Sequence, residues 1–311
     1  ISQIFILSQL NGMTATERAQ LPAAELAVIQ GQELNAVTTS YVILGLVMIV
    51  LLLAIRFTKM PNLRESGEKV EFGATLRRLK KNKNYVWGVV AQFFNIGAQI
   101  AVWSFVIRYA MQQLNFDGVL ASLGDSASAD DVVNALRGVE PVAAAFYNCC
   151  EWIGLNDLLP RTSEQAAATY YIMSLILFVL MRFACTGMMK YVKAYKLLIG
   201  LALLAVACCI GAMFGEGSFG VYCLMGISGC MSLMFPTIYG FGLTGLGEDT
   251  KIGGSFMVMA IAGAAILTQI QGIVSDQTGS IMTAYIVPAF AFAVIAYYGY
   301  FVARKQELSI K

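Results

Sequence analysis

The sequence predicts an all-α membrane protein, and three observations support this fold class. Of the 311 residues, 58% are apolar and only 13% are charged, with a mean hydropathy of +0.68, whereas about 25% of residues are charged in soluble domains. Apolar segments long enough to cross a hydrocarbon core of about 30 Å recur along the chain. Basic residues gather at 56–83, 190–196 and 304–311, which all fall on the cytoplasmic side if successive spans alternate in direction.

The first predicted membrane helices differ in length. Residues 1–10 are apolar but would extend only about 15 Å as a helix, so we expect them to end a spanning helix and the chain to be a C-terminal fragment. Thr16 is a candidate N-cap for a short helix that ends near Leu26. The segment 38–57 is long enough to cross the membrane, and we expect an amphipathic helix at 72–81 on the inner membrane surface.

Six further spans complete the predicted bundle. They cover residues 85–111, 167–189, 197–214, 219–243, 255–275 and 281–303. A long loop at 112–166 carries eight acidic and two basic residues, an imbalance that fits the outer side of the membrane. Within this loop we expect a capping box formed by Ser128 and Asp131, and a short helix at 141–155. The sequence therefore predicts seven full spans and one partial span.

The composition argues against several functions. The chain has no His, which removes the commonest metal ligand and the usual general base. Its seven cysteines lack metal-site spacing, and the adjacent Cys149 and Cys150 either form a disulfide or remain thiols. The predicted spans carry no central carboxylate for catalysis and no central Lys for a retinal Schiff base. We therefore expect neither an enzyme nor a photosensor, and no cofactor or metal. The basic cluster at 56–83 is explained by membrane orientation rather than nucleic-acid binding.

A polar stripe follows one face of the span 85–111. Its members are Gln92, Asn95, Gln99 and Trp103. At 100° per residue these side chains fall within an arc of about 80°. Sugar recognition uses amides that hydrogen-bond hydroxyl groups and an aromatic ring that stacks on the C–H face. The same stripe also fits hydrogen bonds between packed helices, so the spacing alone leaves both interpretations open.

A second stripe lies in the span 219–243. Its members are Ser228, Ser232, Phe235 and Tyr239. Helix packing is the simpler explanation here. In the following span, Gln269 and Gln271 are polar but point in different directions, so at most one of them is expected to face a shared cavity.

Three long segments carry a resemblance to a known family. They are VAQFFNIGAQIAVWSFVIRYA (Val90–Ala110), FPTIYGFGLTGLGEDTKIGGSFMVM (Phe235–Met259) and GIVSDQTGSIMTAYIVPAFAFAVI (Gly272–Ile295). They resemble the fucose–proton symporter family of the major facilitator superfamily, which also contains glucose/galactose permeases. The resemblance implies twelve helices in two six-helix halves. The chain would then hold the end of helix 5 and helix 6 at 1–57, the cytoplasmic central loop at 58–84, and the C-terminal half at 85–311.

The same resemblance implies a function. It points to a secondary active transporter that carries a monosaccharide such as fucose, glucose or galactose together with a proton, by alternating access. The alternative is a nutrient sensor or receptor of the same fold that does not transport. The resemblance further implies a multi-pass protein of the bacterial inner membrane that acts as a monomer. Its partners would be the sugar, the proton and the lipid bilayer, without nucleic acid.

In this family the helices at 85–111 and 219–243 line the central cavity, so the resemblance favours substrate binding by both polar stripes. The implied substrate-binding residues are Gln92, Asn95, Gln99, Trp103, Ser232, Phe235, Tyr239 and Gln269. Two positions depart from the family pattern. Asn95 stands where an aromatic residue is expected, and Phe235 stands where a Tyr is expected before Pro-Thr.

The segment GLGEDTKIG at 245–253 is expected on the cytoplasmic side. Its glycines suit a tight solvated turn with unusual backbone angles. Alternatively, its charges could close an inner gate by pairing with another loop. The first interpretation is the simpler one.

Overall fold

The computed structural model describes residues 22–57, 72–122, 129–155, 159–160 and 162–310. Over these residues all regular secondary structure is helical, as the sequence predicts. Seven of the described helical segments are long and apolar enough to cross a membrane, which agrees with the seven full spans expected. The expected helix end at 1–10, the cap at Thr16 and the cap at Ser128 lie outside the described residues.

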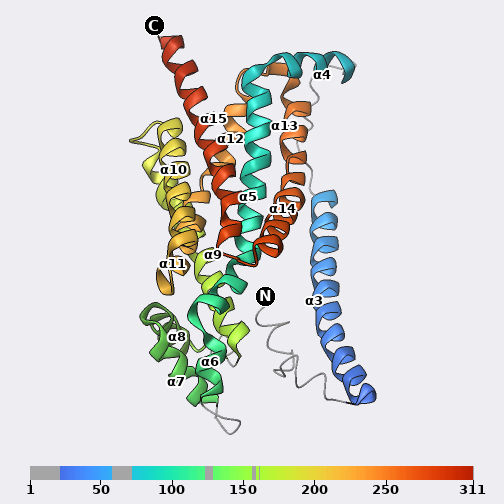
Figure 1. Ribbon diagram of the computed structural model, residues 1–311. Coiled ribbons are helices and arrows are strands. Elements are labelled where there is room, and N and C mark those ends of the chain that lie inside the picture. The colour runs from blue at the N-terminus through green and yellow to red at the C-terminus, as the bar shows by residue number, and fades with distance from the viewer. Residues whose placement is uncertain (1–21, 58–71, 123–128, 156–158, 161, 311) are drawn as a thin grey trace. The chain divides into compact units, whose positions relative to one another are not determined.

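The larger of two compact units comprises Val70–Gly118 and Ala167–Lys311. Its central element is the long helix α5, which contacts most of the other helices (Figure 1). The helices of this unit are α4 (Phe72–Lys81), α5 (Lys83–Leu114), α9 (Ser163–Met188), α10 (Ala194–Phe214), α11 (Ser218–Met231), α12 (Met234–Leu243), α13 (Thr250–Met259), α14 (Ala262–Thr278) and α15 (Ile286–Ile310). Helix α5 packs on α11, α12, α14 and α15, and α10 packs on α11 and α15.

Glycines allow α5 to approach its neighbours closely. A Cβ added at Gly97 would lie 2.8 Å from the Gly263 carbonyl oxygen on α14, and one added at Gly263 would lie 2.1 Å from the Phe93 carbonyl oxygen. A Cβ at Gly88 would lie 3.0 Å from the Cα of Gly242 on α12. Small residues at such crossings are typical of helices that associate in lipid, where close backbone contact supplies the attraction.

Two of the predicted spans are interrupted. The expected continuous span at 219–243 is divided into α11 and α12 by a turn at Ser232–Leu233. The physical reason is Pro236, which has no N–H to donate to the carbonyl of Ser232 one turn earlier. The expected span at 255–275 is divided into α13 and α14 at residues 260–261. Both breaks lie about ten residues from the span ends that face each other across the connection 244–249, namely Leu243 and Thr250.

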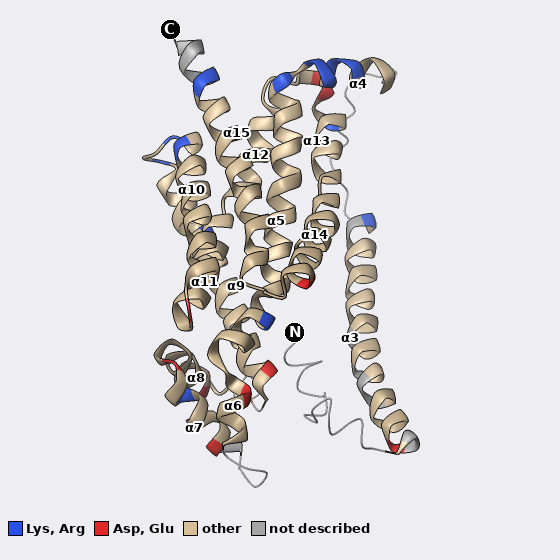
Figure 2. Ribbon diagram, in the orientation of Figure 1, with Lys and Arg blue, Asp and Glu red and all other residues tan. Residues whose placement is uncertain are grey.

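One end of the larger unit carries most of its basic residues. Helix α4 has the predicted bounds Phe72–Lys81, and Figure 2 shows blue ribbon segments, which mark Lys and Arg, along α4 and near the C-terminal end of α15. The side chain of Asn82 caps α5 by accepting hydrogen bonds from the backbone N–H groups of Asn84 and Tyr85. Arg78 donates two hydrogen bonds to the carboxylate of Asp249, at 2.8 Å and 2.7 Å.

The expected external loop at 112–166 contains more helix than the sequence suggests. Helix α5 continues to Leu114, and short helices follow: α6 (Phe116–Ala121), α7 (Ala129–Val139) and α8 (Pro141–Ile153). The predicted helix at 141–155 is therefore present, with Gly154 as its C-cap in the left-handed conformation (φ 81°). Cys149 and Cys150 are free thiols. Separately, α3 runs unbroken over Ala23–Phe57, because its polar first half consists of good helix formers.

Candidate functional site

Two hydrogen bonds fix the register of α5 against the antiparallel pair α11 and α12. The side-chain nitrogen of Asn84 donates to the carbonyl of Phe241 at 2.8 Å, and the indole N–H of Trp103 donates to the Ser228 hydroxyl at 3.2 Å. Because the helices are antiparallel, each step of one residue toward the C-terminus of α5 corresponds to about one residue toward the N-terminus of the pair α11 and α12. The segment 92–99 therefore lies opposite about 231–236, which includes the break between α11 and α12. The two polar stripes predicted from the sequence are thus neighbours in the fold.

The first two members of the α5 stripe are completely buried. Gln92 and Asn95 each have 0% exposure, and the oxygen and nitrogen of both side-chain amides lack a hydrogen-bond partner. Buried polar groups are normally paired, and leaving one unpaired costs about 1–3 kcal/mol. These four atoms are therefore the most conspicuous unmet hydrogen-bonding capacity near the helix break.

The other two members of the stripe are only partly buried. Gln99 lies one turn beyond Asn95 and retains some exposure. Trp103 donates its indole N–H to Ser228 and makes edge-on ring contacts with Tyr171 and Phe178 of α9, at centroid distances of 6.4 Å and 5.4 Å. This arrangement uses the indole N–H within the bundle. The role of Trp103 visible in the structure is therefore to link α5, α9 and α11.

The second stripe surrounds the helix break. Ser232 is 1% exposed and its hydroxyl lacks a partner. Phe235 and Tyr239 are partly exposed and lie parallel, with ring centroids 6.2 Å apart and an interplanar angle of 7°. Together they form a flat aromatic surface of the kind that can stack against the C–H face of a sugar ring.

The two glutamines of α14 point in different directions, as the sequence predicts. Gln271 is completely buried and neither atom of its side-chain amide has a partner. It shares a face with Gly263 and Leu267, which lie against Gly97 of α5. Gln269 is exposed and makes no contact with the other predicted site residues that the structure records. Its place in a binding site stays a prediction.

Sequence reasoning missed one polar group close to the stripe. The hydroxyl of Tyr298 on α15 is buried without a partner, and it reaches to within 3.1 Å of where a Cβ of Gly88 would lie. Gly88 is one helical turn from Gln92 on the same face of α5. A tyrosine inside an otherwise apolar span was the available signal, because its hydroxyl needs a partner when buried.

The chemistry of this region is uncharged. Among the described residues, no group of three or more His, Cys, Asp or Glu side chains is arranged to hold a metal ion, and Figure 2 shows α5, α12 and α14 without charge along most of their length. The region offers amides, hydroxyls and aromatic rings. These groups suit a neutral polyhydroxyl ligand better than an ion.

The chain is similar in sequence to known sugar transport proteins. The chain is 30% identical over 297 residues to the L-fucose-proton symporter of Escherichia coli (strain K12), a match that covers 94% of the chain and 58% of that protein. It is also 30% identical to the L-fucose-proton symporter of Haemophilus influenzae over 90% of the chain, and 26% identical to the glucose/galactose transporter of Brucella abortus. The chain therefore spans somewhat over half the length of these relatives. No protein-family model matches it.

Solved structures give the same result for the fold. The crystal structure of the major facilitator superfamily transporter FucP in the outward conformation matches with a TM-score of 0.66, at 30% identity, over 96% of the chain and 62% of that structure. A structure of a variant of the E. coli fucose:proton symporter matches with a TM-score of 0.67 at 29% identity. The names of these relatives all describe transport proteins. The chain is therefore a multi-pass membrane protein with the fold of the major facilitator superfamily, and its sequence is similar to those of fucose-proton symporters.

Proposed function

We propose that the protein is a secondary active transporter that moves a monosaccharide together with a proton by alternating access. The sugar is of the class that the relatives' names indicate, namely fucose, glucose or galactose. We also propose that residues 85–311 form the C-terminal six-helix half, 58–84 the cytoplasmic connection and 1–57 part of the other half. No chemical change of the substrate is involved.

One observation supports a sugar site in this half above all others. The amides of the α5 stripe lie opposite a helix break, and the parallel rings of Phe235 and Tyr239 follow directly after this break. Transporters of several folds place their substrates where helices are interrupted at mid-membrane, because backbone and side-chain groups freed by the break become available to the ligand. A monosaccharide offers hydroxyl groups and C–H faces and carries no charge, so it matches the uncharged amides and aromatic rings of this region.

The proposal is tested by uptake of labelled L-fucose, D-glucose and D-galactose in cells that express the complete protein. Gln99→Ala and Asn95→Ala should abolish uptake of the transported sugar while leaving the amount of protein in the membrane unchanged. Gln277→Ala is the matched control, because Gln277 is an exposed amide near the outer end of α14 and should transport normally. Normal sugar counterflow in both stripe variants would overturn the site assignment.

A proton measurement separates symport from the alternatives. Adding the transported sugar to energy-depleted cells in weakly buffered medium should raise the external pH, because each sugar enters with a proton. Sugar uptake without this pH change would refute proton coupling. Specific sugar binding without any uptake would instead indicate a sensor.

A further inference from the structure

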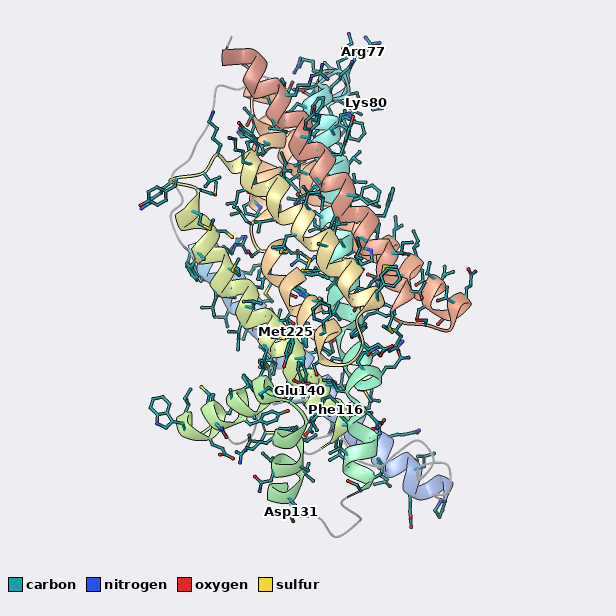
Figure 3. The ribbon with its side chains drawn as sticks, turned by 60° about the vertical axis from the view of Figure 1, so that its left-hand side comes forward. Arg77, Lys80, Phe116, Asp131, Glu140 and Met225 are labelled. Carbon is teal, nitrogen blue, oxygen red and sulfur yellow. The ribbon has the colours of Figure 1, made fainter. Side chains whose placement is uncertain are left out.

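Helix α8 has two apolar faces, and only one of them is covered. Ala143, Tyr147 and Cys150, spaced by about one turn, are buried, and α8 packs against α7. Figure 3 shows this helical hairpin, with Asp131 near the start of α7 and Glu140 at the junction of the two helices. This buried face alone accounts for the packing of α8 against α7.

The other apolar face of α8 is exposed. Val142, Trp152 and Ile153 have exposed fractions of 38%, 88% and 57%, and with the exposed Cys149 they fall within an arc of about 100°. Leu155, directly after the C-cap, is 46% exposed. The single charged residue of the helix, Glu151, is paired with Arg137 of α7. The exposed face is therefore neutral and apolar over the whole length of α8.

The covalent chain keeps this face close to the membrane. The spanning helix α9 begins at Ser163, ten residues after the end of α8 at Ile153. Ten residues extend at most about 36 Å, so the outer membrane interface is within reach of α8. An amphipathic helix with a Trp on its apolar side typically lies in the interface plane, with that side among the headgroups and upper acyl chains.

We propose that α8 rests on the outer leaflet and inserts Trp152, Ile153 and Leu155 into it, which anchors the α7–α8 hairpin to the lipid surface. Because the exposed face is neutral, the partner is the apolar and interfacial part of any phospholipid, whatever its headgroup charge. This surface is separate from the sugar site and does not depend on transport.

The test is tryptophan emission of the complete protein in lipid vesicles. The emission lost when Trp152→Phe is introduced belongs to Trp152, and Phe keeps the face apolar so that the hairpin is preserved. In vesicles whose acyl chains are brominated near the headgroup, this component should lose more than half of its intensity relative to unlabelled lipid. Bromine near the chain ends should quench it less, and aqueous iodide should scarcely quench it.

Two results would overturn the proposal. If iodide quenches the Trp152 component and brominated lipid does not, the face is in water. If neither quenches it, another protein surface covers the face, either a different part of the protein or a second copy. Incomplete reconstitution is recognised in two ways. The emission of the tryptophans in the spans serves as an internal reference, and the vesicles are also diluted with unlabelled lipid.

Discussion

The close crossing of α5 and α14 gives a sharp test of the packing. A Cβ at Gly263 of α14 would lie 2.1 Å from the carbonyl oxygen of Phe93 on α5 and 2.9 Å from its carbonyl carbon, whereas ordinary contacts begin at 3.4 Å. The shortfall of about 1.3 Å is against backbone, which cannot rotate away, so Gly263→Ala must move one helix. Overpacking of this kind typically costs about 1–3 kcal/mol. Part of this loss is offset because Ala favours a helix by up to about 1 kcal/mol over Gly.

A control on the same helix removes the effect of helix propensity. A Cβ at Gly272 would meet nothing within 4 Å, so Gly272→Ala gains the propensity without the clash. Gly97→Ala, whose Cβ would lie 2.8 Å from the Gly263 carbonyl oxygen, should fall between the two. Thermal unfolding of the purified variants in one detergent should therefore rank Gly263→Ala lowest and Gly272→Ala highest, separated by at least a few degrees. Equal midpoints for these two variants would refute the close crossing of α5 and α14.

Three further outcomes are expected. Phe235→Tyr should change the ratio of fucose to glucose uptake by up to about fivefold, the value of one hydrogen bond, and an unchanged ratio would argue against contact between this residue and the sugar. Arg78→Gln and Asp249→Asn should show a coupling energy of up to about 1 kcal/mol in a double-mutant cycle of unfolding, and additive effects would contradict the ion pair. At neutral pH a membrane-permeant maleimide should modify the exposed Cys149 before Cys150, because burial, and then the neighbouring Cys149, raises the pKa of the Cys150 thiol. Modification of Cys150 should accelerate as the pH rises toward that higher pKa. Equal rates of modification of Cys149 and Cys150 at neutral pH would show that the face of α8 that carries Cys150 is open.

The number and order of the spans were predictable from sequence because they depend on local properties. Hydropathy, segment length and the side of the basic clusters need no knowledge of tertiary contacts. The bounds of α4 and the start of α8 were predictable for the same reason, since amphipathic spacing and a Pro at the first turn act within one helix. The resemblance to symporters then supplied the arrangement of helices, which local properties do not contain.

The interruptions of the two spans were not predicted, although one of them had a visible cause. Pro236 was noted, yet Pro is tolerated inside membrane helices, so its presence alone did not require a break. At residues 260–261 the chain shows no Pro, and the backbone instead tightens into bonds between residues three apart, such as Ala264 N–H to the Ile261 carbonyl at 2.9 Å. This turn directly precedes the close contact of Gly263 with α5. A feature set by contact with another helix is not accessible to sequence periodicity.

The candidate site illustrates the same limit in more detail. Helical spacing placed Gln92, Asn95, Gln99 and Trp103 on one face but could not say what that face meets. In the structure, Gln92 and Asn95 are buried between helices without hydrogen-bond partners, whereas Trp103 bonds to Ser228, as expected of helix packing. Gln99, Phe235 and Tyr239 retain exposed surface, which direct contact with a sugar requires. Loss of uptake in Asn95→Ala therefore fits either sugar binding or disturbed packing, whereas loss in Gln99→Ala with unchanged thermal stability fits binding alone, so Gln99 is the more decisive position.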